Sequence, residues 1–348
     1  MAKRRQSVSL QEEDAFKIVI DELIEEIIWH PTLGDTEVET WLLKMVDYTV
    51  PLGKQLRGRG VISAFKSFRG LTTKEDLKPI FVLGWCVELL AASFFIAEDI
   101  IRRSVKRRNQ LCWHLVKDVG KSAISDSILL QDIMYFIIDK HFSGQPCHKP
   151  LVQLFHKCYF NTSLGQNLDA RIGRMKDISE FTFENYNRVS KYKTGYFSFY
   201  LPLAIGKIMS DCGDIDPTEM RLIEDIAVDM GQLFMTQDDF LDCFGDPEIT
   251  GRFATKIQGN ACTWFIIKAL SMASPEQEKI LKEHYGQPGT DSANKVMKIF
   301  RALNLVDHYK RYEMQCYKSI MEKISNLPDS IPALYFSETL DIILKRDR

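Results

Sequence analysis

The sequence has 348 residues, of which 45% are hydrophobic, so the chain can bury a sizeable core. Basic and acidic residues number 45 and 47, and the formal net charge of -2 gives no reason to expect a nucleic-acid partner. The eight cysteines form no CxxC pair, and the N-terminus has no apolar signal core, so we expect reduced thiols and a cytoplasmic protein.

Apolar residues recur at helical spacing from residue 16 to residue 28 and along most of the chain, whereas sustained period-two alternation is missing. The predicted fold class is therefore all-α. Residues 80–97 have Glu88 as their only charge and approach the length of a membrane span. We expect a buried helix and no membrane span, because Glu98 and Asp99 follow at once and no second such stretch accompanies it.

A further helix is predicted over residues 217–244. Asp216 supplies its N-cap, Pro217 takes the first helical position, and Glu219 completes a capping box. Gly245 and the proline two residues later end the helix. The loops elsewhere are too short to link domains, so we predict a single domain over residues 1–348.

The strongest chemical signal lies at the end of this helix, in the run QDDFLD at residues 237–242. Asp238 and Asp242 are four residues apart and share a helical face, which is costly inside a cavity unless a cation lies between them. Carboxylate oxygens suit Mg²⁺. A solvated acidic helix end would show the same spacing, so the neighbouring residues must decide between the two interpretations.

Those neighbours resemble a known family. The run QDDFLDCFGDPEITG at residues 237–251 closely resembles the second aspartate-rich motif of farnesyl diphosphate synthases, and similar landmarks stand at residues 53–57, 84–90, 191–194 and 198–202. The sequence is identified as a member of the trans-isoprenyl diphosphate synthase family. The resemblance implies an isoprenoid synthase (class I terpenoid synthase) helical bundle around a deep cavity and a homodimer. It also implies three Mg²⁺ ions, with Mn²⁺ able to substitute, that bind the diphosphate of an allylic substrate.

The resemblance also implies roles for individual residues. The expected metal ligands are Glu98, Asp99, Asp238 and Asp242, and the expected catalytic residues are Asp238, Asp239, Lys193 and Arg107. Residues expected around the allylic diphosphate are Lys193, Thr194 and Arg252, with Asp169 nearby. Residues expected around isopentenyl diphosphate are Gly53, Lys54, Arg57, Arg107 and Arg108, and further substrate contacts are expected from Ser93, Phe94, Phe197 and Met235.

The first aspartate-rich motif departs from the family, because Arg102 stands where its last aspartate is expected. Arg102 must turn away from a metal or bind the diphosphate itself. The alternative is an i,i+4 ion pair between Glu98 and Arg102 on an inert surface. Polar or charged family residues are also replaced at six further positions, namely Ala91, Phe197, Met235, Lys256, Gly259 and Ala261.

Because these replacements remove partners of a second diphosphate and dry the space beside an allylic cation, they favour cyclisation over condensation. Ser93 replaces a bulky residue and deepens the tail pocket. We therefore expect an insect-type terpene synthase, a Mg²⁺-dependent lyase that ionises farnesyl or geranylgeranyl diphosphate. Two alternatives remain: a condensing prenyltransferase, supported by the retained basic residues, and a non-catalytic subunit that modulates an active synthase, motivated by Arg102, Lys256 and Ala261.

Overall fold

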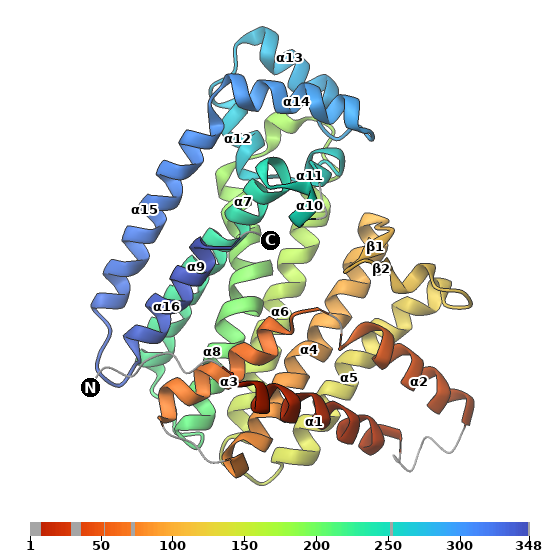
Figure 1. The fold of residues 1–348 in the computed structure, drawn as a ribbon, viewed down its shortest axis with the longest axis vertical. Helices are drawn as coiled ribbons and strands as arrows, with labels where there is room; N and C mark the ends of the chain where they lie inside the picture. Colours follow the sequence, from red (N-terminus) through yellow and green to blue (C-terminus); the bar gives the residue numbers. More distant parts are fainter. Residues whose placement is uncertain (1–7, 29–35, 52, 71–73, 251–252, 347–348) are drawn as a thin grey trace. The chain divides into compact units, whose positions relative to one another are not determined.

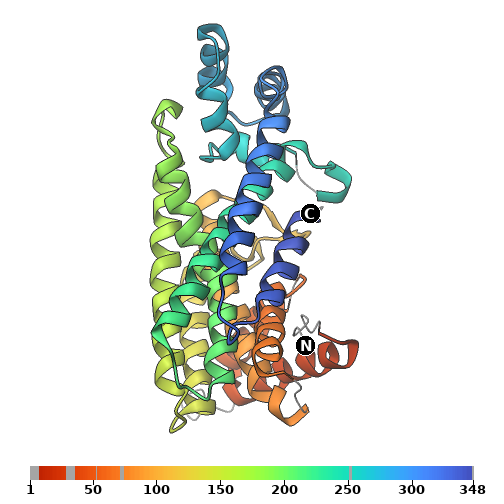
Figure 2. The same ribbon diagram turned by 90° about the vertical axis from the view of Figure 1, so that its left-hand side faces the viewer.

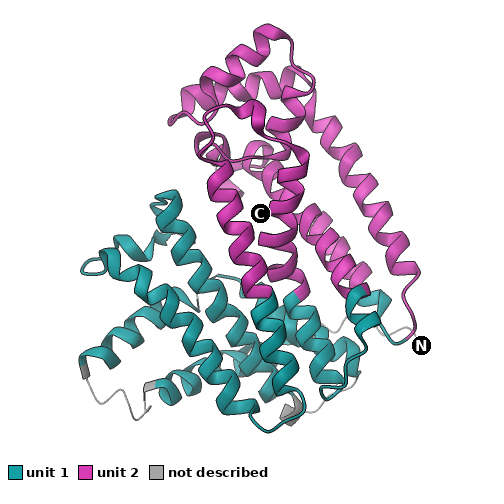
Figure 3. Ribbon diagram, turned by 180° about the vertical axis from the view of Figure 1, so that it is seen from behind, with its two compact units in different colours: residues 1–157, 201–221, 330–335 teal, residues 158–200, 222–329, 336–348 magenta. Residues whose placement is uncertain are grey.

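The computed structural model describes residues 8–28, 36–51, 53–70, 74–250 and 253–346, and helices dominate these ranges (Figure 1). Within them the only strands are β1 (Lys106–Arg107) and β2 (Gln110–Leu111), which pair antiparallel. The predicted all-α class is confirmed. The chain forms two compact units, each made of three segments (Figure 3): unit 1 holds Met1–Lys157, Leu201–Arg221 and Ser330–Tyr335, and unit 2 holds Cys158–Tyr200, Leu222–Asp329 and Phe336–Arg348. The single domain over residues 1–348 stays a prediction.

Unit 1 is built around a long apolar helix, α4. Its elements are α1 (Leu10–Ile28), α2 (Thr36–Thr49), α3 (Leu56–Arg69), α4 (Lys74–Arg102), the β1–β2 hairpin, the 3₁₀ turns Trp113–Leu115 and Gly120–Ser122, α5 (Ala123–Phe142), the first part of α6 (His148–Ile172) and α8 (Leu201–Ser210).

Helix α4 packs against α1, α3 and α5, and Figure 1 shows α4 and α5 side by side. Its Trp85 is fully buried and stacks on Phe16 of α1 with ring centroids 4.4 Å apart. The Trp85 indole also donates a 2.6 Å hydrogen bond to the Phe16 carbonyl. Helix α4 is long and apolar enough to cross a membrane, but 89% of its most apolar window is buried inside the structure. The expected buried helix is confirmed, and α4 is a core helix rather than a membrane span.

A buried carboxylate holds three elements of unit 1 together. Asp126 of α5 accepts hydrogen bonds from the indole nitrogens of Trp41 in α2, at 2.8 Å, and of Trp113, at 2.7 Å. Only 4% of Asp126 is exposed, so water cannot replace these donors. Because a buried carboxylate is costly unless hydrogen-bonded, the two indoles and Asp126 depend on one another.

Unit 2 holds the second part of α6 and most of the remaining helices. Its elements are the 3₁₀ turn Ile178–Glu180, α7 (Phe183–Val189), the π-helix Ser190–Tyr200, α9 (Pro217–Phe244, from Leu222 on), α10 (Pro247–Thr250), α11 (Thr255–Gln258), α12 (Trp264–Leu270), α13 (Pro275–His284), α14 (Thr290–Ala302), α15 (Leu305–Ser325) and the last part of α16 (Ala333–Leu344). Helices α13 and α14 pack together, as Figures 1 and 2 show.

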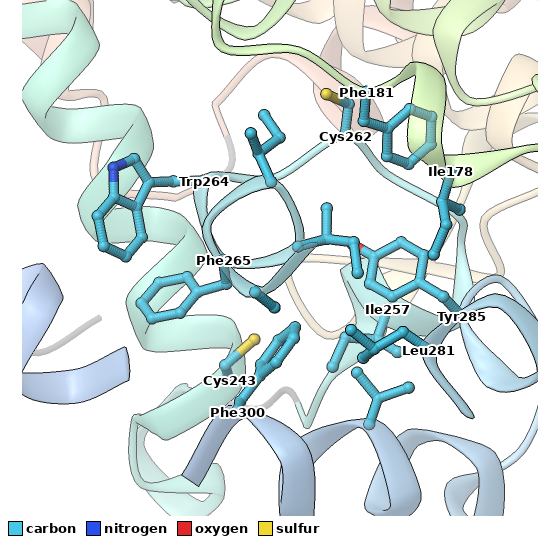
Figure 4. Close-up of a cluster of buried hydrophobic side chains, with 14 of the residues drawn as sticks. Ile178, Phe181, Cys243, Ile257, Cys262, Trp264, Phe265, Leu281, Tyr285 and Phe300 are labelled. Atoms are coloured by element: carbon cyan, nitrogen blue, oxygen red, sulfur yellow. The ribbon is translucent and has the colours of Figure 1, made fainter. Parts of the chain in front are cut away.

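The core of unit 2 is rich in aromatic rings. Phe265 of α12 is fully buried and contacts Trp264, Phe300 and Tyr309, with ring centroids 5.1 to 6.1 Å apart. Figure 4 shows Phe265, Phe300 and Cys243 around this cluster. Since Cys243 lies on α9 directly after the aspartate-rich run, this apolar packing fixes the end of the helix that carries Asp238, Asp239 and Asp242.

The predicted helix over residues 217–244 is confirmed as α9. Asp216 caps it, because its carboxylate accepts a 2.7 Å hydrogen bond from the Thr218 amide. The predicted capping box is wrong. Glu219 instead accepts from Ser330 and forms a 2.5 Å ion pair with Lys207, because a buried ammonium is a stronger partner than a helix-end amide.

Candidate active site

The first carboxylate pair of the candidate site lies at the C-terminal end of helix α4 in unit 1. Glu98 and Asp99 lie near this end, where carboxylates are unfavourable beside the negative end of the helix dipole. Basic side chains offset that charge. Arg107 makes a bidentate ion pair with Asp99, with both N–O distances at 2.7 Å, and lies 3.5 Å from Glu98. Arg102 lies 3.0 Å from Glu98, so the i,i+4 ion pair weighed from the sequence is present.

A tight hairpin brings Arg107 to this position. Lys106 pairs with Leu111 and Arg107 with Gln110, which leaves Arg108 and Asn109 as the two turn residues. Both turn residues have left-handed backbone angles, with φ of 52° and 65°. Asparagine tolerates this region well, but arginine does not, so the hairpin stores some strain at Arg108. The hairpin places the adjacent guanidinium groups of Arg107 and Arg108 beside the end of α4.

Three guanidinium groups converge on one aromatic ring in unit 1. The guanidinium carbons of Arg57, Arg107 and Arg108 lie 5.3, 4.5 and 5.3 Å from the ring centre of Phe95. Burial, opposed by Glu88 and reinforced by the two neighbouring arginines, lowers the pKa of Arg57 to about 10. The group stays charged at neutral pH. Such a cluster is suited to a polyanion that contacts several guanidinium groups at once.

Gly53 leaves room for one of these arginines. Its backbone has φ of 89°, and a Cβ atom placed there would lie 2.7 Å from Arg108 Nε and 2.8 Å from Arg108 Cζ. Both the backbone angle and the close approach therefore require glycine. Lys54 follows with an exposed side chain. The structure thus brings Gly53, Arg57, Arg107 and Arg108 together, and their role as one binding site, which the resemblance implies, stays a prediction.

The second carboxylate cluster lies in unit 2, at the end of α9. Lys256 places its ammonium between two of its members, 2.7 Å from Asp238 Oδ2 and 2.6 Å from Asp239 Oδ1. Burial alone would lower the pKa of Lys256, but the three aspartates together raise it, so the side chain is a permanent cation. Asp238 also lies 3.4 Å from Arg346, which follows α16.

The remaining oxygens of this cluster accept hydrogen bonds from fixed donors. Asp239 Oδ2 accepts from the Tyr186 hydroxyl at 2.8 Å and from the Trp264 amide at 3.0 Å, and only 1% of the residue is exposed. Asp242 accepts from the Thr255 hydroxyl through Oδ1 and from the Lys256 amide, at 2.9 Å, through Oδ2. Asp242 therefore anchors the turn that delivers Lys256.

The π-helix Ser190–Tyr200 positions the basic residues expected near the allylic diphosphate. Lys193 forms a 2.7 Å ion pair with Asp169 of α6. Helix α6 can approach because Gly165 has no side chain: a Cβ atom there would lie 2.4 Å from the Lys193 amide nitrogen. Thr194 donates to the Met235 sulfur at 3.9 Å. Since π-helical turns are frequent at functional sites, this segment is a good candidate for substrate contact.

Other predicted substrate contacts lie in the interiors of the two units. Ser93 and Phe94 on α4 are buried, with 6% and 8% exposed, and Phe197 on the π-helix is 3% exposed. Their roles in substrate binding stay predictions. Arg252 lies outside the described residues.

The expected Mg²⁺ would need several carboxylate oxygens that point into one space. Among the described residues, no group of three or more His, Cys, Asp or Glu side chains is arranged to hold a metal ion. The oxygens are of the right chemical type, but Lys256 occupies the space between Asp238 and Asp239, and both oxygens of Asp242 already accept hydrogen bonds. Glu98 and Asp99 are paired with arginines. In this arrangement the carboxylates do not fit Mg²⁺.

Two important contacts were missed from the sequence. The sequence presents Lys256 as the replacement of an acidic residue and as one reason to consider a non-catalytic subunit, but it does not show that the lysine pairs with Asp238 and Asp239. Arg346 lies 108 residues from Asp238 in the chain, and no local sequence pattern predicts a contact over that separation. The hairpin was missed because its strands have two residues each, and only the Arg-Asn turn at 108–109 could have indicated it.

Comparison with known proteins identifies close similarities. Residues 39–303 match the polyprenyl synthetase family. The chain is 37% identical over 347 residues to farnesyl pyrophosphate synthase of Artemisia annua, covering 98% of this chain and 99% of that protein. The Kluyveromyces lactis enzyme of the same name is 38% identical over 301 residues, 84% of this chain and 86% of that protein. The structure of T. brucei farnesyl diphosphate synthase complexed with bisphosphonate superposes with a TM-score of 0.88 at 31% identity, over 97% of this chain and 99% of that one.

These findings confirm the isoprenoid synthase fold and correct the expected activity. The prediction of an insect-type terpene synthase, a lyase, is wrong, because the relatives are named farnesyl pyrophosphate synthases. The lost polar residues do not by themselves indicate a changed reaction. Ala91 and Phe197 are 1% and 3% exposed, and apolar side chains at such positions are explained by core packing without a change of reaction.

Proposed function

This chain belongs to the polyprenyl synthetase family, and from that premise we propose that it is a prenyltransferase that condenses an allylic isoprenyl diphosphate with isopentenyl diphosphate. The names of its relatives support the proposal. The observation that carries it is the convergence of Arg57, Arg107 and Arg108 on Phe95. A condensing enzyme must hold two diphosphates, and this cluster supplies a separate place for the second one.

The cluster suits the isopentenyl substrate in both charge and shape. Guanidinium groups bind phosphate oxygens through paired hydrogen bonds, and the three around this ring would contact both phosphates once Arg107 turns from Asp99 to the substrate. Binding a diphosphate would also place negative charge beside the three guanidinium groups and offset the mutual repulsion of the arginines. Gly53 keeps Arg108 within reach, and Lys54 adds a further positive charge beside it.

We assign the allylic substrate to the residues of the π-helix. Lys193 and Thr194 would contact its diphosphate together with Arg252, and the apolar side chains Phe197 and Met235 would contact its isoprenoid tail. In the reaction the allylic carbon–oxygen bond breaks and the diphosphate leaves. A carbon–carbon bond then forms to the isopentenyl unit, which loses a proton.

Several expectations accompany this proposal. Three Mg²⁺ ions, with Mn²⁺ as a substitute, stay a prediction that would require Lys256 to leave Asp238 and Asp239. A homodimer in the cytosol also stays a prediction. Because the described carboxylates are already paired, the roles assigned above rest on the basic and apolar side chains that would contact the two substrates.

A second candidate is a non-catalytic subunit that modulates an active synthase. One observation favours it: in both carboxylate clusters the acidic side chains are held by basic ones, Glu98 and Asp99 by arginines and Asp238 and Asp239 by Lys256. Such a protein would bind the substrates without converting them. A product assay distinguishes it from the prenyltransferase, because a non-catalytic subunit forms no longer isoprenyl diphosphate.

The test is to incubate purified protein with Mg²⁺, a C5, C10 or C15 allylic diphosphate, and radiolabelled isopentenyl diphosphate. The prenyltransferase proposal predicts label in a longer isoprenyl diphosphate. Unchanged substrates in every combination, together with measurable binding of labelled isopentenyl diphosphate, would instead support the modulatory subunit.

A further inference from the structure

The second aspartate cluster contains a cation that belongs to the protein itself. The Lys256 ammonium lies 2.7 Å from Asp238 Oδ2 and 2.6 Å from Asp239 Oδ1, in the space between two carboxylates where a metal would have to bind. Asp239 is 1% exposed, so its charge needs a partner inside the protein. Lys256 is that partner, and it is itself largely buried, with 19% of its side chain exposed.

A turn that is held by hydrogen bonds positions the Lys256 ammonium. Ala254 takes a left-handed backbone angle of 49° and donates its amide to the Asp242 carbonyl at 2.8 Å. The Thr255 hydroxyl and the Lys256 amide then occupy the two carboxylate oxygens of Asp242. One aspartate of the run thus fixes the turn that places Lys256 against the other two.

From this geometry we propose that Lys256 is the resident cation of the cluster formed by Asp238, Asp239 and Asp242, and that it keeps Mg²⁺ out of this cluster. A divalent ion binding here would have to displace the ammonium, because two cations cannot share the space between the same oxygens. It would also have to strip Asp242 of the hydrogen bonds that hold the turn. Mg²⁺ demands near-ideal octahedral geometry and gains little from carboxylates that are already engaged.

The chain provides a matched control for this proposal. On the same helix α9, Asp225 and Asp229 are four residues apart, and Lys323 bridges them at 2.7 and 2.6 Å. Lys323→Gln removes the same charge from a more exposed aspartate pair, with side-chain exposures of 62% and 30% against 23% and 1% for Asp238 and Asp239. The Lys323 site lacks the third aspartate and the closed turn. Lys323→Gln therefore shows how the loss of a lysine alone changes metal binding.

The experiment measures Mn²⁺ binding to the full-length protein without substrates, from the loss of the free Mn²⁺ signal in electron paramagnetic resonance. Lys256→Asp and Lys256→Gln are expected to bind one ion per chain at least tenfold more tightly than the wild type, whereas Lys323→Gln should behave like the wild type. The same Kd within twofold for the wild type and a folded Lys256 variant would overturn the proposal, as would an equal gain in Lys323→Gln.

A further comparison does not depend on the folding of the Lys256 variants. If Lys256 keeps the cluster closed, Asp238→Asn should bind Mn²⁺ with the same stoichiometry as the wild type. Loss of one bound ion per chain in Asp238→Asn would mean that the wild-type cluster takes up metal, which overturns the proposal. Because no substrate is present, these results are independent of whether the chain is a prenyltransferase.

Discussion

Gly53→Ala tests the assignment of Arg108 to the isopentenyl diphosphate site. The new Cβ atom would lie 2.7 Å from Arg108 Nε, so the guanidinium must move by about 0.7 Å or more to reach an ordinary contact distance. Arginine is flexible, and the movement itself costs the fold little. The movement shifts the guanidinium away from its position over Phe95. The diphosphate would then lose charge-assisted hydrogen bonds to Arg108, which contribute about 1.5 to 3 kcal/mol.

The backbone adds a second effect that must be separated from the first. An alanine at φ of 89° loses about 1 to 3 kcal/mol of stability whatever surrounds it. Gly70→Ala is the matched control, because Gly70 has φ of 91° and its Cβ atom would meet nothing within 4 Å. The two variants should therefore lose similar stability on urea unfolding.

Their kinetics should differ. In Gly53→Ala, kcat/KM for isopentenyl diphosphate should fall about tenfold to a hundredfold, since each 1.4 kcal/mol corresponds to a factor of ten, while KM for the allylic diphosphate stays within twofold. Gly70→Ala should keep both values. Equal losses in the two variants, or a loss confined to the allylic substrate, would refute the assignment.

Three further predictions concern a substrate contact and two structural carboxylates. Lys193→Gln should raise KM for the allylic diphosphate about tenfold or more and leave KM for isopentenyl diphosphate unchanged in steady-state assays. Asp126→Ala should lower the free energy of unfolding by about 2 to 6 kcal/mol because two indole donors lose their acceptor, and Asp126→Asn should lose less because its amide oxygen still accepts one. Burial works against the charge of Glu219, but Lys207 and Ser330 lower its pKa, so its contribution is present above pH 4.5 and is lost as the pH falls through the folded-state pKa. Glu219→Gln should accordingly melt below the wild type at pH 7, and the difference should shrink below pH 4.5; a difference that stays constant down to pH 3 would contradict this.

The fold was largely predictable because its signals are local. The helical repeat of apolar residues gave the class, and Asp216, Pro217 and Gly245 gave both ends of α9 within a residue. The role of Glu219 was not predictable, since its partner Lys207 lies on another helix and its partner Ser330 lies 111 residues away in the chain. Rules for helix caps consider only neighbouring residues, so they cannot predict which of several partners a side chain binds.

The candidate site was predictable in its residue types but not in its contacts. The resemblance grouped Gly53, Lys54, Arg57, Arg107 and Arg108, and the structure brings Gly53 and the three arginines together. Lys256 stood out as a departure from the family, yet its ion pairs depend on the turn that Asp242 anchors, which is a tertiary property.

The reaction was misjudged for a related reason. A substitution seen in one sequence shows which side chain is lost, but not whether packing compensates for it. Ala91 lies in the core of α4, where an apolar side chain needs no hydrogen-bond partner. Counting lost polar groups therefore favoured a changed reaction that the relatives do not support.

The central claim, condensation of two diphosphates, is tested most directly by the release of inorganic diphosphate from an allylic substrate as isopentenyl diphosphate is titrated in. The prenyltransferase account predicts that release requires isopentenyl diphosphate, saturates with it, and yields one inorganic diphosphate for each isopentenyl unit incorporated. Release at the same rate in its absence, with no isopentenyl unit in the product, would contradict the account.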